Sequence, residues 1–296
     1  MVAFRDAGPA HGDRDPLDWR LLDPPPLPVE GTRMTDRQPP GPGLPGAALN
    51  RIYDYSLGGK DNYGADRAVA IEAFGSFQAA RLLPRENRKF LRRAVRHMLD
   101  EGVRQFLDVG CGLPGKGNVH EVVHARDAAG RVVYVDIDRV AVVHYQALLH
   151  AVPNAAAVHG DARKPHAILA DPEVTALIDL RRPVGVLMTA TLDAILDEED
   201  PEGIVRAFTD AMAPGSHLAI CDFTDDAMTS CERALQDRII TDAGLVFTSR
   251  SRSRIAAFFD GLDLVEPGLV PAPEWRPDRP HEPATGWLVA GVGRKP

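Results

Sequence analysis

The 296-residue chain has little cysteine and no long apolar run. Its three cysteines, Cys111, Cys221 and Cys231, are an odd number without a CxxC pair, which argues against a disulfide scaffold or a zinc finger. No segment approaches the ~20 consecutive apolar residues of a membrane-spanning helix, and residues 1–15 lack the apolar core of a signal peptide. The sequence therefore predicts a cytoplasmic protein with no membrane partner.

Basic residues are too few for a polyanionic partner. The 34 Lys and Arg residues are outnumbered by 42 Asp and Glu, which gives a net charge of −8. Since nucleic-acid binding needs a basic surface that neutralises phosphates, we expect no nucleic-acid partner. One helix expected over 84–101 nevertheless has a basic face, made of Arg85, Arg88, Lys89, Arg92, Arg93 and Arg96. Because the chain as a whole is acidic, we interpret this face as solvated.

Proline is abundant only at the start of the chain. Ten of the 25 prolines lie in the first 45 residues, where few apolar residues accompany them. Such a composition buries too little apolar surface to offset the entropy of ordering, so we predict a flexible tail over residues 1–48. Translation could start at Met1 or at Met34.

From residue 49 onward, segments with helical and strand periodicity alternate. Helices are expected over 65–76, 84–101, 118–128, 139–150, 172–180, 201–211, 230–243 and 252–259, and strands over 105–109, 131–136, 155–159, 184–191, 217–223, 262–266 and 286–292. Strands separated by helices indicate right-handed crossovers between parallel strands. We predict an α/β fold: a doubly wound, mostly parallel, seven-stranded Rossmann-like sheet over 104–296, preceded by a helical cap over 49–103.

A glycine loop follows the first expected strand. Gly110, Gly112 and Gly115 fit the GxGxxG pattern, in which glycines let the backbone approach a ligand closely. The pattern alone is weak and leaves an NAD(P)-dependent oxidoreductase open. Asp108, two residues before Gly110, would repel a pyrophosphate and suits a ligand with an ammonium or sulfonium group. Asp108 therefore favours a cationic ligand over a dinucleotide.

Two more acids follow the next two expected strands. Asp136 ends the second strand, where a carboxylate can accept hydrogen bonds from ribose hydroxyls in either class of enzyme. Asp161 follows the third strand. An isolated Asp in such a place is more often a helix cap or a loop residue, but three acids after three successive strands favour a nucleoside site.

Eight segments resemble a bacterial S-adenosyl methyltransferase family that was long catalogued as a domain of unknown function. They are residues 51–67 (RIYDYSLGGKDNYGADR), 86–96, 105–108, 112–114, 117–122, 132–136, 258–261 and 266–270. The form Asp-x-Gly-x-Gly at Asp108 also resembles the first motif of class I methyltransferases. The resemblance implies a class I methyltransferase fold, S-adenosylmethionine as the cofactor and an unidentified small-molecule acceptor.

The resemblance also implies which residues bind the cofactor. Asp161 would accept from the adenine amino group, and the backbone N–H of Ala162 would meet a ring nitrogen. From the residue types themselves, Tyr53, Tyr55 and Tyr63 could each form a wall of the site or pack the cap onto the sheet, and Lys60 or Asn62 could meet the cofactor carboxylate. The full set is Tyr53, Asn62, Asp108, Gly110, Gly112, Asn118, Asp136, Ile137, Asp161, Ala162 and Ala190.

The sequence departs from the family pattern where the acceptor is expected. Leu-His-Phe after the fourth strand is replaced by Leu192-Asp193-Ala194, and a Ser-His pair after the fifth strand by Cys221-Asp222. If Asp193 and Asp222 both face the methyl group, they make the pocket acidic and favour an amine-bearing acceptor. Asp193 and His120 are the candidate bases. The same departures leave open a non-catalytic module that binds S-adenosylmethionine, and the oligomeric state is open as well.

One pattern is typical of a metal site. His120-Glu121-Val122-Val123-His124 matches H-E-x-x-H, which on a helix can place two imidazoles on one zinc ion. No third ligand follows at a recognisable spacing, and the pattern lies inside the methyltransferase resemblance. We therefore predict no metal.

Overall fold

A computed structural model describes residues 46–279, 282 and 284–296. Residues 1–45 of the expected flexible tail, with both candidate start methionines, lie outside the described residues. The strands are β1 (Gln105–Val109), β2 (Arg131–Asp136), β3 (Ala155–His159), β4 (Gly185–Thr189), β5 (His217–Phe223), β6 (Asp263–Leu264), β7 (Val270–Pro271) and β8 (Leu288–Arg294). The helices are α1 (Leu49–Ser56), α2 (Gly64–Ser76), α3 (Leu83–Asp100), α4 (Val119–His124), α5 (Arg139–Leu148), α6 (Pro165–Leu169), α7 (Pro172–Leu177), α8 (Pro201–Ala211), α9 (Ser230–Asp242) and α10 (Arg252–Ala257). None of these helices is both long and apolar enough to cross a membrane.

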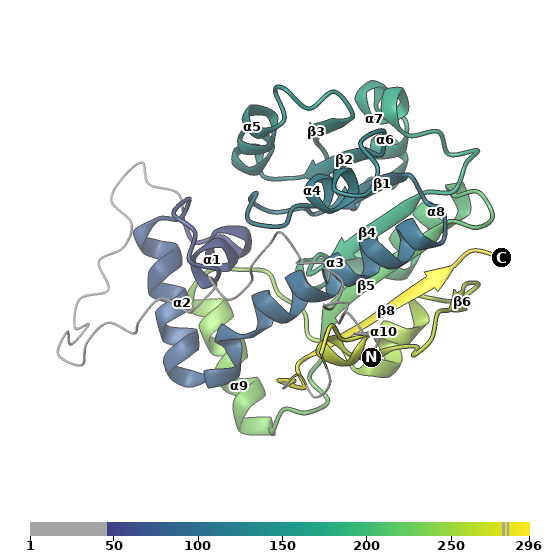
Figure 1. Cartoon of the computed structure of the whole chain (residues 1–296). Helices are drawn as coiled ribbons and strands as arrows, with labels where there is room; N and C mark the ends of the chain where they lie inside the picture. The colour runs from purple at the N-terminus through teal and green to yellow at the C-terminus, as the bar shows by residue number, and fades with distance from the viewer. Residues whose placement is uncertain (1–45, 280–281, 283) are drawn as a thin grey trace, which may run out of the picture.

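All the strands belong to one sheet, in the order β3-β2-β1-β4-β5-β8-β6, and β7 also pairs with β8 (Figure 1). β1 to β5 are parallel, and β8 runs antiparallel to its neighbours. The prediction of a mostly parallel, doubly wound sheet is confirmed. The expected count of seven strands is wrong by one, because the two-residue β7 is too short to have a periodic pattern. The fourth strand stops at Thr189, since Ala190 has a left-handed backbone with φ of 57°.

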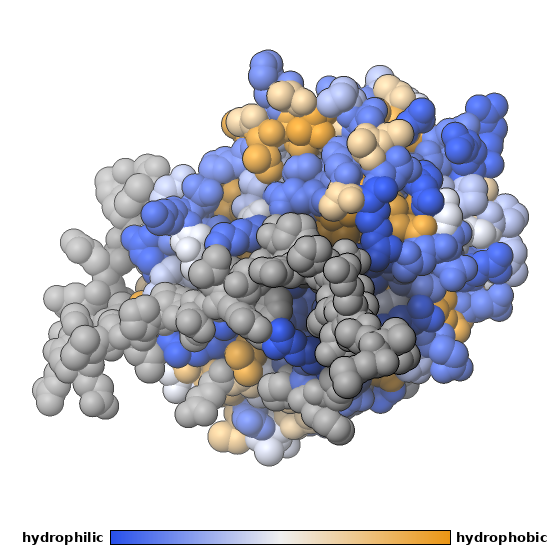
Figure 2. Space-filling model, viewed as in Figure 1, coloured by the Kyte–Doolittle hydropathy of each residue, from blue (hydrophilic) through white to orange (hydrophobic). Residues whose placement is uncertain are grey.

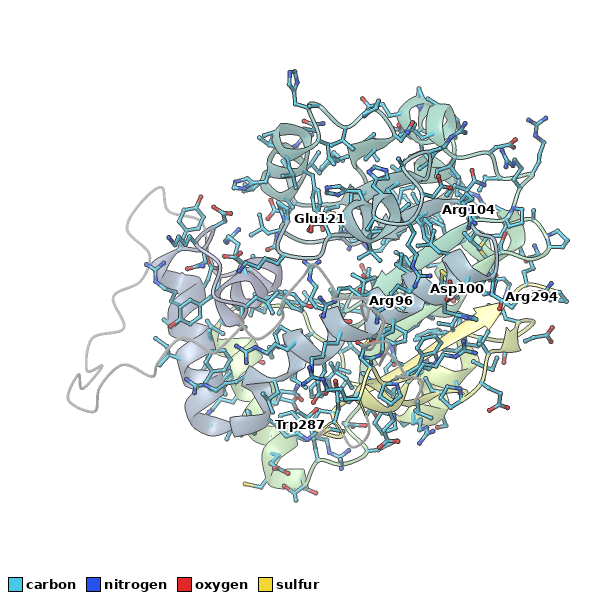
Figure 3. The ribbon with its side chains drawn as sticks, viewed as in Figure 1. Arg96, Asp100, Arg104, Glu121, Trp287 and Arg294 are labelled. Atoms are coloured by element: carbon cyan, nitrogen blue, oxygen red, sulfur yellow. The ribbon has the colours of Figure 1, made fainter. Side chains whose placement is uncertain are left out.

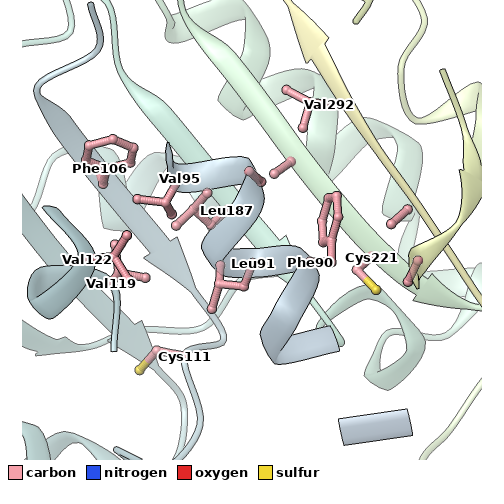
Figure 4. Close-up of a cluster of buried hydrophobic side chains, with 14 of the residues drawn as sticks. Phe90, Leu91, Val95, Phe106, Cys111, Val119, Val122, Leu187, Cys221 and Val292 are labelled. Carbon is pink, nitrogen blue, oxygen red and sulfur yellow. The ribbon is translucent and has the colours of Figure 1, made fainter. Parts of the chain in front are cut away.

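Helices cover both faces of the sheet because successive strand residues point to opposite sides. Phe106 of β1 belongs to a buried apolar cluster with residues of α3, α4 and α5, part of which is drawn in Figure 4. Its neighbour Leu107 belongs to a second cluster, with residues of α6, α7, α8 and α10. The carboxyl ends of the parallel strands lie between these two layers, and the ligand site is built there.

Helix α3 lies along one face of the sheet (Figure 1). Pro84 stands in its first turn, where a missing N–H costs nothing, and Phe90 is fully buried on its apolar stripe. The interpretation of its basic face as solvated is wrong. Arg93 is 3% exposed and donates to the carbonyls of Trp275 (Nε, 2.8 Å) and Ala272 (Nη2, 2.6 Å). A segment distant in sequence thus covers this face, which the local charge pattern could not reveal.

Helices α1 and α2 form a cap that is held together by a buried ion pair. Arg51 Nε lies 3.0 Å from Asp66 Oδ2, and both side chains are buried. Asp66 also accepts hydrogen bonds from the backbone N–H groups of Ala48 (2.9 Å) and Tyr63 (2.7 Å). A fully hydrogen-bonded buried pair fixes the geometry of the cap, because loss of either partner leaves an uncompensated charge. The expected division of the domain into a cap over 49–103 and a core over 104–296 stays a prediction. Helix α3, which belongs to the expected cap, packs directly on the sheet.

His217 is a buried histidine whose two ring nitrogens have no hydrogen-bond partner among the described residues. It begins β5 and is 1% exposed. Its ring lies edge-on to that of His97, with 5.7 Å between centroids. Burial, with a smaller contribution from His97, lowers the pKa of His217 to about 4. His217 is therefore neutral in the folded protein at neutral pH.

We expect His217 to make the fold sensitive to acid. Below its unfolded-state pKa of about 6.5, the unfolded chain takes up a proton that the native state excludes until about pH 4. This proton alone reduces the free energy of unfolding by ~1.4 kcal/mol per pH unit in that window. Urea unfolding at pH 7 and pH 5 should show a smaller loss for His217→Gln than for the unaltered chain. The exposed His166→Gln is the control, and equal losses in all three proteins would contradict the expectation.

Candidate functional site

A cavity of about 750 Å³ opens at the carboxyl ends of β1, β2 and β4. The strand order reverses between β1 and β4, which is the place where open α/β sheets bind ligands. Helices α1, α2, α3 and α9 contribute the remaining walls. Nine of the eleven predicted cofactor residues line this cavity: Tyr53, Asp108, Gly110, Gly112, Asp136, Ile137, Asp161, Ala162 and Ala190.

The glycine loop after β1 presents its backbone to the cavity. Gly110 and Gly112 have φ of 74° and 65°, a conformation that favours glycine. A Cβ atom on Gly110 would lie 2.5 Å from Thr191 Oγ1, so a side chain cannot be accommodated there. A Cβ atom on Gly112 would come no closer than 3.9 Å to its nearest neighbour, Asn50. The loop is therefore tightly packed at Gly110 and open to a ligand at Gly112.

Asp136 links this loop to the end of β2. Its Oδ2 accepts from Gly112 N (2.7 Å), and its Oδ1 accepts from Asp138 N (2.8 Å). Burial raises the pKa of Asp136, and these two hydrogen bonds oppose the rise. A carboxylate oxygen has two lone pairs, so each oxygen can accept one more hydrogen bond from a ribose hydroxyl.

Asp108 and Arg88 bring opposite charges to one end of the cavity. Asp108 is 3% exposed and receives no hydrogen bond from the described part of the chain, and burial raises its pKa to about 7 against the opposing effect of Arg88. Arg88, from α3, also lines the cavity and donates to Leu113 O (3.2 Å). This pair matches a zwitterionic amino-acid group, with Asp108 facing an ammonium and Arg88 a carboxylate.

Arg88 was missed in the sequence because it was assigned to a solvated face. The position of Arg88 relative to the apolar residues of α3 does indicate that its side chain is not simply solvated. Arg88 stands three and seven positions before Leu91 and Val95, which are both buried, so the three residues share one stripe of α3. A charged residue on an apolar helical stripe is a candidate for a binding role.

Tyr53 forms a wall of the cavity and also fixes the cap. Its hydroxyl donates to Pro84 O (2.9 Å) and accepts from Asn87 Nδ2 (3.0 Å), while its ring lies 5.7 Å from the Arg88 guanidinium. Burial raises the pKa of Tyr53 to about 12. The two interpretations of this tyrosine, as a wall and as packing, are therefore compatible.

Three predicted site residues lie outside the cavity lining. Asn62 donates to Asp54 Oδ2 (2.8 Å), and Asn118 Oδ1 accepts from Gly115 N (2.9 Å). His120 has its Nδ1 2.8 Å from the hydroxyl of Tyr134. Each of these polar groups is used within the protein, so they support neighbouring loops and strands instead of reaching the ligand space.

Asp161 and Ala162, the two residues expected around adenine, both line the cavity, and so does Ile137, which is 55% exposed. Apolar side chains are also exposed on α5, among them Val143 and Leu148, and orange patches mark apolar residues on the surface in Figure 2. Asp161 already accepts from Arg163, at 2.9 Å from Nε and 3.0 Å from Nη2, and these hydrogen bonds hold the pKa of Asp161 below its usual value. An adenine amino group would share this carboxylate with Arg163.

Of the two acids expected on the acceptor side, only Asp193 lines the cavity. Asp193 lies in the turn Leu192–Ala194, and burial raises its pKa to about 6 against the effect of Arg250. Asp222 points to the opposite face of β5 from Phe223, and its Oδ2 lies 3.8 Å from Arg250 Nη1. The expectation that both acids face the methyl group fails for Asp222. Its neighbour Phe223 lines the cavity, and successive residues of a strand point to opposite faces of the sheet.

Arg250 holds the acceptor-side turn in position. It is 3% exposed and donates to the carbonyls of Leu192 (2.7 Å) and Ile195 (2.6 Å), and its Nε donates to Asp197 (2.9 Å). Sequence reasoning missed this residue because it lies more than 50 positions from its partners.

The H-E-x-x-H pattern does not form a metal site in the structure. The ring of His120 is hydrogen-bonded to the hydroxyl group of Tyr134, and His124 Nε2 lies 2.9 Å from Gly130 O. Within the described ranges, no group of three or more His, Cys, Asp or Glu side chains is arranged to hold a metal ion.

Comparison with known proteins agrees with this geometry. The model of the family described as S-adenosyl methyltransferase matches residues 45–296. A putative methyltransferase from Thermobifida fusca YX is 38% identical, with 88% of this chain and 98% of that one covered and a TM-score of 0.80. A DUF574 family protein from Streptomyces avermitilis MA-4680 is 35% identical, with coverage of 85% and 98% and a TM-score of 0.80. None of the curated proteins matches.

The family match covers the whole sheet and the cap, and it includes every residue that lines the cavity. The cavity itself fits S-adenosylmethionine, because an open glycine loop lies between Asp136 and Asp108, whose carboxylate accepts no hydrogen bond from the described residues. The chain belongs to the S-adenosyl methyltransferase family and is an S-adenosylmethionine-dependent methyltransferase.

Proposed function

We propose that this methyltransferase binds S-adenosylmethionine along the strand ends and methylates a small amine-bearing molecule beside Asp193. One observation carries the proposal: a single cavity joins Asp108, Asp136 and Asp161 on its cofactor side to Asp193 on its other side. Cofactor and acceptor can therefore meet without solvent between them.

The assignment of residues to the cofactor follows the geometry of the cavity. Asp108 binds the ammonium and Arg88 the carboxylate of the methionine part, while Asp136 binds the ribose. Backbone groups of the glycine loop and the ring of Tyr53 complete the walls. The remaining contacts are made by Ile137, Asp161, Ala162 and Ala190. Asn62 and Asn118 support these residues from behind.

The transfer needs orientation and a proton acceptor. When bound, S-adenosylmethionine supplies a methyl group on a positively charged sulfur, which is a good leaving group. The glycine loop and Asp136 orient the donor side, so the gain comes mainly from alignment. Asp193, with a pKa of about 6, is ionised at pH 7.5 and can take the proton that the acceptor loses. His120 is not assigned the role of proton acceptor, because its ring is hydrogen-bonded to the hydroxyl group of Tyr134.

An amine suits the acceptor side better than a carboxylate or a phosphate. The other acids of the lining, Asp108, Asp136, Asp138 and Asp161, lie at the cofactor side, and so do its arginines, Arg51, Arg88 and Arg163. Asp193 is thus the charged side chain that remains for the acceptor. Because Arg250 lies behind Asp193, the preference depends on a hydrogen bond from the amine more than on net charge.

The proposed cellular location and the exclusion of a nucleic-acid acceptor are supported by the amino-acid composition. All three cysteines are unpaired, which supports the expectation of a reducing, cytoplasmic location. The net charge of −8 supports a small-molecule acceptor and not a nucleic acid. A non-catalytic module would bind the cofactor equally well, so measured turnover distinguishes it from the enzyme.

We expect Asp136→Ala to weaken binding of S-adenosylhomocysteine, the demethylated product, by about 1.5–3 kcal/mol, the contribution of a hydrogen bond to a charged group. Isothermal titration calorimetry measures this directly. Asp210→Ala, an exposed change on α8, should leave the affinity unchanged. An unaltered affinity in Asp136→Ala would place the ribose elsewhere.

Cofactor affinity should depend on pH through Asp108. Below its pKa of about 7, Asp108 is protonated and loses its attraction for an ammonium, so the affinity should fall as the pH is lowered from 8 to 6. The limiting slope is about tenfold per pH unit for one proton. In Asp108→Asn the affinity should be weak and nearly constant over this range. A slope that survives in Asp108→Asn would assign the titration to another group.

Asp193→Asn should separate binding from turnover. It keeps the shape of the side chain but removes its ability to take a proton, so methylation of amines should fall by about 10²–10⁴-fold. The affinity for S-adenosylhomocysteine should stay within about twofold. Release of S-adenosylhomocysteine in the presence of a panel of amines measures the first quantity, and calorimetry the second. Unchanged turnover would exclude Asp193 as the base.

A further inference from the structure

Four aromatic rings that are not among the residues assigned to the cofactor form a continuous wall in the lining of the cavity. Phe77 and Trp287 are in edge-to-face contact with 5.3 Å between centroids, Trp287 and Phe223 are 5.8 Å apart, and Phe223 and Phe247 are 5.2 Å apart. All four residues line the cavity, and Phe77, Phe223 and Trp287 are each less than 10% exposed. We call these four residues the aromatic wall.

The aromatic wall is assembled from four segments that are far apart in sequence. Phe77 ends α2, Phe223 ends β5, Phe247 follows α9, and Trp287 precedes β8. In Figure 3, Trp287 lies at the end of the molecule that carries α2 and α9. The neighbouring lining is mainly aliphatic, with Ile239, Ile240, Leu245 and Val246, and it includes Gln236, whose Oε1 accepts from Ser249 Oγ at 3.1 Å. The wall therefore bounds an apolar space that the cofactor assignments leave unused.

Asp193 lies next to the aromatic wall. Thr248, the residue after Phe247, donates its backbone N–H to Asp193 O at 2.6 Å. Arg250, two residues later, holds the same turn through the carbonyl of Leu192. The backbone of the turn that carries Asp193 is thus held beside the segment 247–250, which carries Phe247.

We propose that the aromatic wall is the acceptor subsite and that the acceptor is an arylalkylamine, an amine joined to an aromatic ring by a short aliphatic chain, whose ring packs against the wall while its nitrogen faces Asp193. This inference rests on the proposed function and specifies its substrate class. Aromatic rings prefer offset or edge-to-face partners, and several rings meeting edge to face offer both faces and edges to a planar ligand. A single carboxyl group beside an otherwise apolar surface selects a ligand that is polar at one end only.

Alternative acceptors fit the same space less well. A saturated amine of equal size could use the apolar surface and Asp193 but would gain nothing from ring-to-ring geometry. An aromatic carboxylate could use the rings but would be repelled by Asp193. A matched set of ligands therefore tests the ring and the amine separately.

The test uses the full chain saturated with S-adenosylhomocysteine. The probes are 2-phenylethylamine, its saturated counterpart 2-cyclohexylethylamine, and phenylacetate, with binding measured by ligand-observed NMR titration. We expect 2-phenylethylamine to bind about 3- to 10-fold more tightly than 2-cyclohexylethylamine, the factor that an aromatic pair contributes. We expect phenylacetate to bind most weakly.

Two variants locate the binding. Phe247→Leu keeps an apolar side chain but removes one ring. In this variant the ratio of the affinities for 2-phenylethylamine and 2-cyclohexylethylamine should be close to one. Phe208→Leu removes a buried ring on the opposite face of the sheet and controls for general loss of packing, so the preference should persist. Both variants should retain the affinity for S-adenosylhomocysteine.

The outcomes separate this inference from the proposed function. Equal binding of the two amines, tighter binding of phenylacetate, or a preference unchanged in Phe247→Leu overturns the aromatic subsite. If S-adenosylhomocysteine binds but no probe binds at millimolar concentration, the aromatic subsite is again overturned while the cofactor site stands. If S-adenosylhomocysteine itself does not bind, the proposed function falls, and the acceptor subsite with it.

Discussion

The carboxylate of Asp136 is the contact on which the cofactor site depends. It receives the backbone N–H of Gly112 from the loop after β1 and that of Asp138 from the loop after β2. Asp138 in turn caps α5 and accepts from Asn50 of α1 at 2.6 Å. Two strand ends, one helix and the cap therefore meet around one acid. A carboxylate suits this position because it has enough lone pairs to hold the loops and still bind a ligand.

Buried charge is placed differently on the two sides of the cavity. Near the glycine loop, Asp108 receives no hydrogen bond from the part of the chain that the structure describes. Burial raises its pKa against the opposing effect of Arg88, and a cationic group would favour the charged form. On the acceptor side, the guanidinium group of Arg250 donates hydrogen bonds to backbone carbonyls in and next to the turn that carries Asp193. The first arrangement leaves charge available to a ligand, whereas the second uses charge to hold the turn that carries Asp193 in place.

Several features could be predicted because they depend on nearby residues. Asp108 and Asp136 stand at the ends of β1 and β2, and Asp161 follows β3. Parallel strands bring their carboxyl ends to one edge of a sheet. The same reasoning failed for Asp222, which like Asp108 is the penultimate residue of its strand but points to the face away from the cavity. It also failed for the basic face of α3, where residues near 275 supply carbonyl partners to Arg93. Pairing between distant segments leaves no local periodic signal.

The sequence by itself determined the alternation of strands and helices apart from α1, α6 and β7, together with the glycine loop and the three acids at the ends of β1, β2 and β3. These features come from local periodicity and from motifs a few residues long. Only the tertiary structure decided that Arg88 reaches the cavity, that His120 does not, and that Phe77, Phe223, Phe247 and Trp287 meet beside Asp193. The physical reason is that side-chain direction and long-range packing set these contacts, and both depend on how distant segments are placed on the folded sheet.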